Sequence, residues 1–235
     1  MCELSEGLTN KNFLVSSDHA RAVIRLNCAD EDQLGIDRDR EARILRSLAR
    51  LGYMADILYQ DDDALVTLYL KGTSVTPRAL QDPKVAAAVS LHLTTIQAVT
   101  LLDESRFCYR DHCSSLAAQL TSKQLQCVDW PALCEAAKSI DLSEWTPRLC
   151  HHDLVPENIR MTQQGVYFID WEYAALGHPA FDWVRLYGAC KAVVARLEGQ
   201  FSLETLKTLA YLQRGIDKLW FAVQDSRKRD NERRG

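Results

Sequence analysis

The spacing of apolar residues changes near residue 70, and this change limits the possible folds more than any other feature of the sequence. Before it, strand-like runs at 13–15 and 22–26 flank a polar turn, which predicts a β-hairpin. After it, apolar residues recur at helical spacing over 84–101 and over 206–223. The sequence therefore predicts an α+β protein with a small β-rich lobe over residues 1–70 and a larger, mainly helical lobe over 71–235.

Weaker signals complete the predicted elements. Residues 37–52 predict an amphipathic helix that Gly52 ends, and residues 64–70 predict a buried strand. The chain starts only four residues before Ser5, so little room is expected for a strand ahead of the hairpin. In the second lobe only 166–169 is a convincing strand, Pro131 and Pro147 interrupt predicted helices, and the tail at 225–235 is expected to fray.

Composition excludes several classes of protein. Lys and Arg number 28 and Asp and Glu number 32, a net charge of −4, which argues against a general nucleic-acid or anionic-membrane surface. No apolar run exceeds five residues, whereas a membrane-spanning helix needs about 20. The N-terminus lacks a secretory signal, and the eight cysteines include no Cys-x-x-Cys pair. Reduced thiols in a cytoplasmic protein are therefore expected, with a small molecule as the partner.

The residues most suited to chemistry lie between 151 and 172. The run His-His-Asp-Leu-Val-Pro-Glu-Asn at 151–158 is followed, after the predicted strand, by Asp170. Phosphoryl transfer needs a carboxylate that orients the attacking hydroxyl, and oxygen ligands that hold Mg²⁺ on the nucleotide phosphates. Asp153, Asn158 and Asp170 supply these groups from one loop and the end of the next strand.

Two other interpretations of this stretch are less favoured. An Asp, a Pro and an Asn can simply form a surface turn, but the additional Asp170 at the end of a strand disfavours that interpretation. Cys150, His151 and His152 lie side by side, but no second ligand pair accompanies them, so a structural zinc site is not expected.

In order along most of the chain, these segments resemble the protein-kinase-like small-molecule phosphotransferases, which include aminoglycoside phosphotransferases and choline, ethanolamine and thiamine kinases. Residues 5–13 (Ser-Glu-Gly-Leu-Thr-Asn-Lys-Asn-Phe) are similar to the loop that covers the nucleotide. Residues 23–26 resemble the strand with the phosphate-binding cation, and residues 35–41 the helix whose glutamate pairs with it. Residues 66–72 resemble the strand and linker that hold adenine, and 169–174 (Ile-Asp-Trp-Glu-Tyr-Ala) the Mg²⁺-binding segment.

The resemblance implies a bilobal protein-kinase-like fold, ATP and Mg²⁺ as cofactors, and roles for single residues. Asp153 is expected to accept or orient the hydroxyl proton, and Asn158 and Asp170 to hold Mg²⁺. The residues expected to bind the nucleotide are Gly7, Thr9, Asn10, Asn12, Arg25, Glu41 and Tyr69. The residues expected to bind the acceptor are Glu172, Tyr173, Trp183 and Trp220, since aromatic rings and carboxylates suit a cation. His151 is expected to be structural, bonding the loop backbone and packing on the metal-binding segment.

The predicted function is transfer of the γ-phosphate of ATP to a hydroxyl of a small cationic metabolite, such as choline, ethanolamine or thiamine. An aminoglycoside is the alternative within the same chemistry, and a catalytically weak nucleotide-binding scaffold is the alternative from another class. Glu6 stands where the family often has a second glycine, which places a negative charge near the phosphates and puts nucleotide affinity in question. The oligomeric state cannot be read from these residues.

Overall fold

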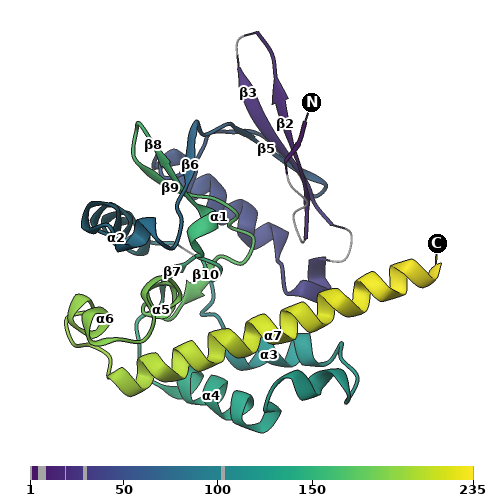
Figure 1. Cartoon of the computed structure of the whole chain (residues 1–235), viewed down its shortest axis with the longest axis vertical. Coiled ribbons are helices and arrows are strands. Elements are labelled where there is room, and N and C mark those ends of the chain that lie inside the picture. The colour runs from purple at the N-terminus through teal and green to yellow at the C-terminus, as the bar shows by residue number, and fades with distance from the viewer. Residues whose placement is uncertain (1, 5–8, 19, 29–30, 102–103, 235) are drawn as a thin grey trace. The chain divides into compact units, whose positions relative to one another are not determined.

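The computed structural model describes residues 2–4, 9–18, 20–28, 31–101 and 104–234. The chain forms two units, and each unit is assembled from separate stretches of the sequence (Figure 1). The first unit contains residues 1–31, 37–104 and 148–175, and the second contains residues 32–36, 105–147 and 176–235. The division into lobes at residue 70 stays a prediction.

An antiparallel sheet of five strands lies in the first unit. The strands are β1 (Cys2–Leu4), β2 (Lys11–Ser16), β3 (Arg21–Leu26), β4 (Ile57–Gln60) and β5 (Ala64–Leu68), in the order β1-β2-β3-β5-β4. β2 and β3 form the predicted hairpin, in which Asn12 lies opposite Arg25. The expectation of little room for an earlier strand is wrong, because β1 pairs with β2 through backbone hydrogen bonds that need no apolar pattern.

Helix α1 (Arg38–Arg50) confirms the helix predicted over 37–52. The Asp37 carboxylate caps it by accepting a hydrogen bond from the backbone N–H of Arg40 at 2.9 Å. Gly52 follows the helix with a φ of 71°, a left-handed conformation that glycine adopts without a steric penalty. The buried face carries Ile44, Leu45 and Leu48 but also Glu41, so α1 delivers a carboxylate to the interior of the first unit.

A second antiparallel sheet of the first unit has the order β6-β8-β9, from β6 (Gly72–Ser74), β8 (Ile159–Thr162) and β9 (Val166–Phe168). Helix α2 (Pro83–Gln97) packs against β9 and β7 (Arg148–Cys150), and short 3-10 helices cover Ala79–Gln81 and Pro156–Asn158. The expectation that residues 71–235 contain a single strand, at 166–169, is wrong. β6, β7 and β8 are too short to show a periodic pattern, and β6 pairs with a strand far along the chain.

The second unit is mainly helical. Its helices are α3 (Tyr109–Ala117), α4 (Trp130–Leu142), α5 (Phe181–Tyr187), α6 (Lys191–Arg196) and α7 (Leu203–Arg234), with 3-10 turns at Glu31–Leu34 and Gln124–Cys127 and the short strand β10 (Ala175–Gly177) before α5. α7 runs along α3 and α4 (Figure 1). A Cβ atom added to Gly215 of α7 would lie 2.3 Å from Cδ1 of Leu133, so the glycine permits the close approach of α7 to α4.

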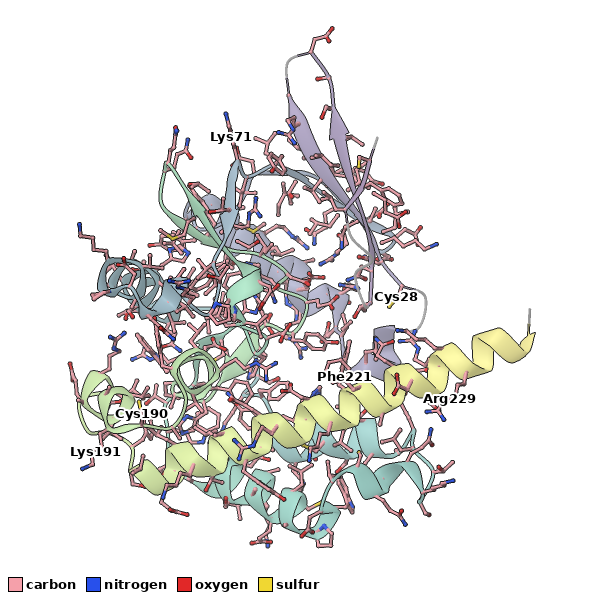
Figure 2. The ribbon with its side chains drawn as sticks, in the orientation of Figure 1. Cys28, Lys71, Cys190, Lys191, Phe221 and Arg229 are labelled. Carbon is pink, nitrogen blue, oxygen red and sulfur yellow. The ribbon has the colours of Figure 1, made fainter. Side chains whose placement is uncertain are left out.

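The C-terminal tail is helical, which corrects the expectation that it frays. α7 continues to Arg234, and both Phe221 and Arg229 lie on it (Figure 2). Residues 225–234 contain neither glycine nor proline and are rich in Arg, Lys and Glu, which have high helix propensity. Residues 225–234 therefore contain no residue type that ends a helix, and α7 continues through them.

No helix in the described part of the chain is both long enough and apolar enough to cross a membrane. All eight cysteines lie in the described part and are free thiols.

Candidate active site

The loop between β7 and β8 brings Asp153 and Asn158 together. The Asn158 side-chain Nδ2 donates to the backbone oxygen of Asp153 at 2.9 Å and to its Oδ2 at 3.2 Å. Two backbone bonds shape the loop, since Val155 N donates to Asp153 O and Asn158 N donates to Val155 O. The carboxylate of Asp153 is thus held on one side by a carboxamide whose own oxygen remains available as a ligand.

Asp170 follows β9 and is tied to the same loop. The backbone N–H of Ile169 donates to the carbonyl oxygen of Asn158 at 2.9 Å, which fixes the residue before Asp170 against the loop. Asp170 is exposed and has a φ of 65°, a left-handed conformation that non-glycine residues rarely adopt. Such strain persists only where the surrounding structure holds it, and it is enriched at functional sites.

His151 supports the loop from inside, as the sequence predicts. Its side chain is 1% exposed, its Nε2 lies 2.8 Å from the carbonyl oxygen of Ile169, and its ring centre lies 4.6 Å from that of Trp171. The structural role predicted for His151 is confirmed. His151, two positions before Asp153, therefore fixes the position of the segment that carries Asp170.

The predicted pair of Arg25 and Glu41 is present in the first unit. Arg25 on β3 donates to both carboxylate oxygens of Glu41 on α1, at 2.6 and 2.8 Å, and both side chains are buried. Burial alone would raise the pKa of Glu41, but the hydrogen bonds and charges of Arg25 and Arg38 outweigh it and lower that pKa. Glu41 is therefore ionised at neutral pH, and the planar fork of Arg25 is fixed in one orientation.

Arg38 is the residue that sequence reasoning missed. It donates to Glu41 Oε2 at 2.8 Å and to Asn10 Oδ1 at 3.0 Å, and its NH1 lies 3.4 Å from Glu172 Oε2. Its position in the Ile-Asp-Arg run at 36–38, three residues before Glu41 on a predicted helix, was the available signal.

Glu172, expected at the acceptor, lies in this same buried group. Its Oε2 accepts a hydrogen bond from Asn10 Nδ2 at 2.6 Å, and the residue is 4% exposed. Burial and then the charge of Asp170 raise its pKa to about 8. The described contacts of Glu172 are thus with the loop and helix that were assigned to the nucleotide.

The remaining predicted nucleotide residues are only partly placed. Gly7 lies outside the described residues. Thr9 is half-buried, and Asn12 lies on β2 opposite Arg25. The ring of Tyr69 is covered by the guanidinium of Arg21, 4.1 Å from the ring centre.

The remaining acceptor candidates divide between the units. In the first unit, the carbonyl oxygen of Tyr173 lies 3.2 Å from Nδ1 of His152. In the second unit, Trp183 is buried and stacked on Tyr187 with ring centres 6.1 Å apart, and Trp220 meets Phe221 edge-on at 5.1 Å. Their role at an acceptor site stays a prediction.

Comparison with known proteins decides the family. Residues 1–212 match the phosphotransferase enzyme family. The chain belongs to this family.

Two curated relatives and one solved structure show how far the likeness of this chain extends. Protein LicA of Haemophilus influenzae is 27% identical over 213 residues, which are 85% of this chain and 60% of LicA. Ethanolamine kinase 2 of Mus musculus is 25% identical over 195 residues, which are 75% of this chain and 50% of that kinase. The crystal structure of choline kinase LicA from Streptococcus pneumoniae matches with a TM-score of 0.79 at 21% identity, covering 95% of this chain and 85% of that one. The last match confirms the predicted fold, and the chain spans only 50–60% of the length of the two curated relatives.

The donor set of this chain fits Mg²⁺ held jointly with a nucleotide. Within the described ranges, no group of three or more His, Cys, Asp or Glu side chains could hold a metal ion by itself. Mg²⁺ in proteins usually takes one or two carboxylates, with phosphate oxygens and waters completing the octahedron. The exposed carboxylate of Asp170 and the Oδ1 of Asn158, whose Nδ2 is engaged by Asp153, meet that requirement.

Proposed function

We propose that this protein transfers the γ-phosphate of ATP to the hydroxyl of a small cationic metabolite, with choline and ethanolamine as the leading acceptors. The observation that carries the proposal is the hydrogen-bonded joining of the Asp153–Asn158 loop to the residue before Asp170. This joining supports a proposal in which Asp153 is the base and Asn158 and Asp170 are the metal ligands, on adjoining segments of one unit, as in-line phosphoryl transfer requires.

The chain's residues divide the work of the transfer. Asp153 accepts the acceptor's hydroxyl proton as the oxygen forms a bond to the γ-phosphorus. The bond from that phosphorus to the β,γ-bridging oxygen breaks, and its electron pair leaves with ADP. Arg25, held by Glu41, offers its fork to the phosphate oxygens. Asp170 and Asn158 are the ligands for Mg²⁺, which when bound neutralises charge on the phosphates.

The acceptor class rests on the relatives and on charge. The relatives are named choline kinase and ethanolamine kinase, and both names specify a small cationic alcohol. An aminoglycoside is a polycation that demands an acidic acceptor rim, whereas residues 71–235 contain twenty basic and nineteen acidic residues. Tyr173, Trp183 and Trp220 are the aromatic residues that we assign to the acceptor. Eight free thiols and the use of ATP favour a cytoplasmic location.

A panel assay tests the proposal. Purified protein is incubated with ATP, Mg²⁺ and one of choline, ethanolamine, thiamine or kanamycin, and ADP release is measured. We expect ADP release with choline or ethanolamine. ADP release with only thiamine or only kanamycin would change the proposed acceptor class. Nucleotide binding without ADP release in the presence of any of the acceptors would refute the proposed transferase activity and support a nucleotide-binding scaffold.

One substitution tests the base. Asp153→Ala is expected to lower turnover by about 10²- to 10⁴-fold, the usual effect of losing a general base, while nucleotide affinity is retained. Glu157→Ala is the matched control, because Glu157 is an exposed acidic residue of the same loop and is expected to leave the rate unchanged. An Asp153→Ala protein with near-full activity would overturn the role of Asp153.

A further inference from the structure

We propose that Arg38 is a positioning residue, which locks the nucleotide loop, helix α1 and the metal-binding segment into one geometry and thereby orients Arg25 for phosphate. The inference rests on the proposed function, because it concerns the nucleotide half of that site. Arg38 itself is assigned no contact with substrate.

The contacts of Arg38 reach three separate parts of the chain. Its guanidinium donates to Asn10 of the nucleotide loop, to Glu41 on its own helix, and lies within 3.4 Å of Glu172, which comes two residues after Asp170. Its side chain is 9% exposed, so these contacts form with little competition from water. A planar guanidinium with several donors suits this three-way bridge, and a lysine ammonium lacks that fixed fork.

Glu41 is shared between two arginines, and the sharing fixes Arg25. Oε1 of Glu41 accepts from Arg25 at 2.6 Å, whereas Oε2 accepts from both Arg25 and Arg38, each at 2.8 Å. The carboxylate can therefore turn only if both guanidinium groups move. Arg38 thus holds the edge of Glu41 that faces Arg25, and Arg25 keeps the orientation that the third bond, from its Nε to Asn27, also requires.

Asn10 connects the same hydrogen-bonded group to the loop that is proposed to cover the nucleotide. Its Nδ2 donates to Glu172 at 2.6 Å, and its Oδ1 accepts from Arg38 at 3.0 Å and from the backbone N–H of Cys28 at 3.3 Å. Cys28 lies just beyond the end of β3 (Figure 2). Asn10 is 5% exposed, so one buried carboxamide joins the loop, the end of β3 and the metal-binding segment.

Charge balance gives Arg38 a second effect on the nucleotide site. Glu41 and Asp170 place negative charge around Arg25, whereas Glu172, whose pKa is raised to about 8, is mostly protonated at neutral pH. Arg38 is a second guanidinium, in contact with Glu41 and Glu172. Without Arg38, less positive charge offsets Glu41 and Asp170 before any phosphate arrives. Because breaking a buried charge pair leaves an uncompensated charge, the loss is expected to appear in the binding of the anionic nucleotide.

The test compares substitutions on one helix. Arg38→Gln is expected to weaken ATP affinity and to raise the KM for ATP by roughly tenfold to a hundredfold, the usual effect of losing hydrogen bonds to charged groups, with the acceptor KM unchanged. Arg38→Lys is expected to recover part of that loss. Arg46→Gln is the matched control, since Arg46 is exposed on α1 and its Nε donates to the carbonyl of Ala42 in its own helix. Affinity is measured by titration of a fluorescent ATP analogue without acceptor.

A double-mutant cycle separates positioning from acceptor binding. Glu172→Gln is expected to raise the KM for ATP rather than that for the acceptor, and its effect is expected to be non-additive with Arg38→Lys. A folded Arg38→Gln or Arg38→Lys protein with wild-type ATP affinity would overturn the proposal, and so would additive effects or a Glu172→Gln effect confined to the acceptor KM. Should Arg38→Gln not fold, the lysine variant and the cycle decide. If the wild type binds ATP but transfers no phosphate, the proposed function fails while the affinity series still decides the role of Arg38.

Discussion

Replacing Asn158 by aspartate tests the carboxamide that holds the proposed base. Asn158 Nδ2 lies 3.2 Å from Oδ2 of Asp153, so Asn158→Asp converts a hydrogen bond into a contact between two carboxylates. Two unit charges at 3.2 Å repel by about 1 kcal/mol in water and about 5 kcal/mol at an effective dielectric constant of 20. Both residues are half-buried, so we expect about 1–3 kcal/mol, a roughly 5- to 150-fold loss of kcat/KM.

The assay separates the two roles of Asn158. Initial rates are measured with ATP and the best acceptor over a range of Mg²⁺ concentrations. Asn158→Asp keeps an oxygen ligand, whereas Asn158→Ala removes it, so only the alanine variant is expected to need more Mg²⁺ for half-maximal rate. Gln164→Glu is the matched control, because it adds the same charge at an exposed position in the turn between β8 and β9.

Three results would refute this reasoning. Asn158→Asp with an unchanged kcat would show that the carboxamide does not support Asp153. Equal Mg²⁺ requirements in the two Asn158 variants would remove the ligand role. A loss of rate in Gln164→Glu as large as that in Asn158→Asp would mean that any added charge on this hairpin lowers activity.

Two further predictions concern charge and stability. Burial lowers the pKa of His92 and of His178 from 6.5 to about 4, with the charge of Arg106 adding to the effect at His178. The unfolded chain therefore binds protons below pH 6.5 that the folded chain binds only near pH 4, so stability is complete above pH 6.5 and falls toward pH 4 by up to about 3 kcal/mol per histidine. Urea midpoints at pH 7 and pH 5 should show this loss, His92→Phe should reduce it, and equal midpoints would contradict it. Asp170→Asn should abolish turnover yet keep or raise the Tm. The charge of Asp170 opposes ionisation of the buried Glu172, and asparagine tolerates the left-handed backbone at this position. A large fall in Tm would show that the Asp170 carboxylate stabilises the fold.

Local pattern was sufficient for several elements of the fold. The β2–β3 hairpin and helix α1 follow from residues close together in the sequence, whereas the structural role of His151 followed from the family resemblance. The pairing of Arg25 with Glu41, sixteen positions apart, also followed from the family resemblance, and the structure contains it. The roles of Asp153, Asn158 and Asp170 came from a specific motif and stay predictions until the kinetic tests are done.

Local sequence patterns could not predict contacts between residues that are far apart in the sequence. Asn10 and Glu172 are 162 positions apart, and Arg38 and Glu172 are 134 apart, so no local rule could show that the three share one buried group. The acceptor role of Glu172, inferred because it follows Asp170, stays a prediction, and its described contacts are with Asn10 and with Arg38 of α1. The strands β6 and β8 were missed because each is short and finds its partner only in the folded chain.

The sequence by itself determined which reactive groups the chain has, because residue types and their spacing specify the carboxylates, the amide and the arginine. Only the tertiary structure decided how those groups are held, since the burial of Arg38 with its partners makes each carboxylate's orientation depend on segments far away in the chain. The physical reason is that hydrogen bonds between buried charged groups depend on distance and direction. Both are set by packing, which a linear pattern does not contain.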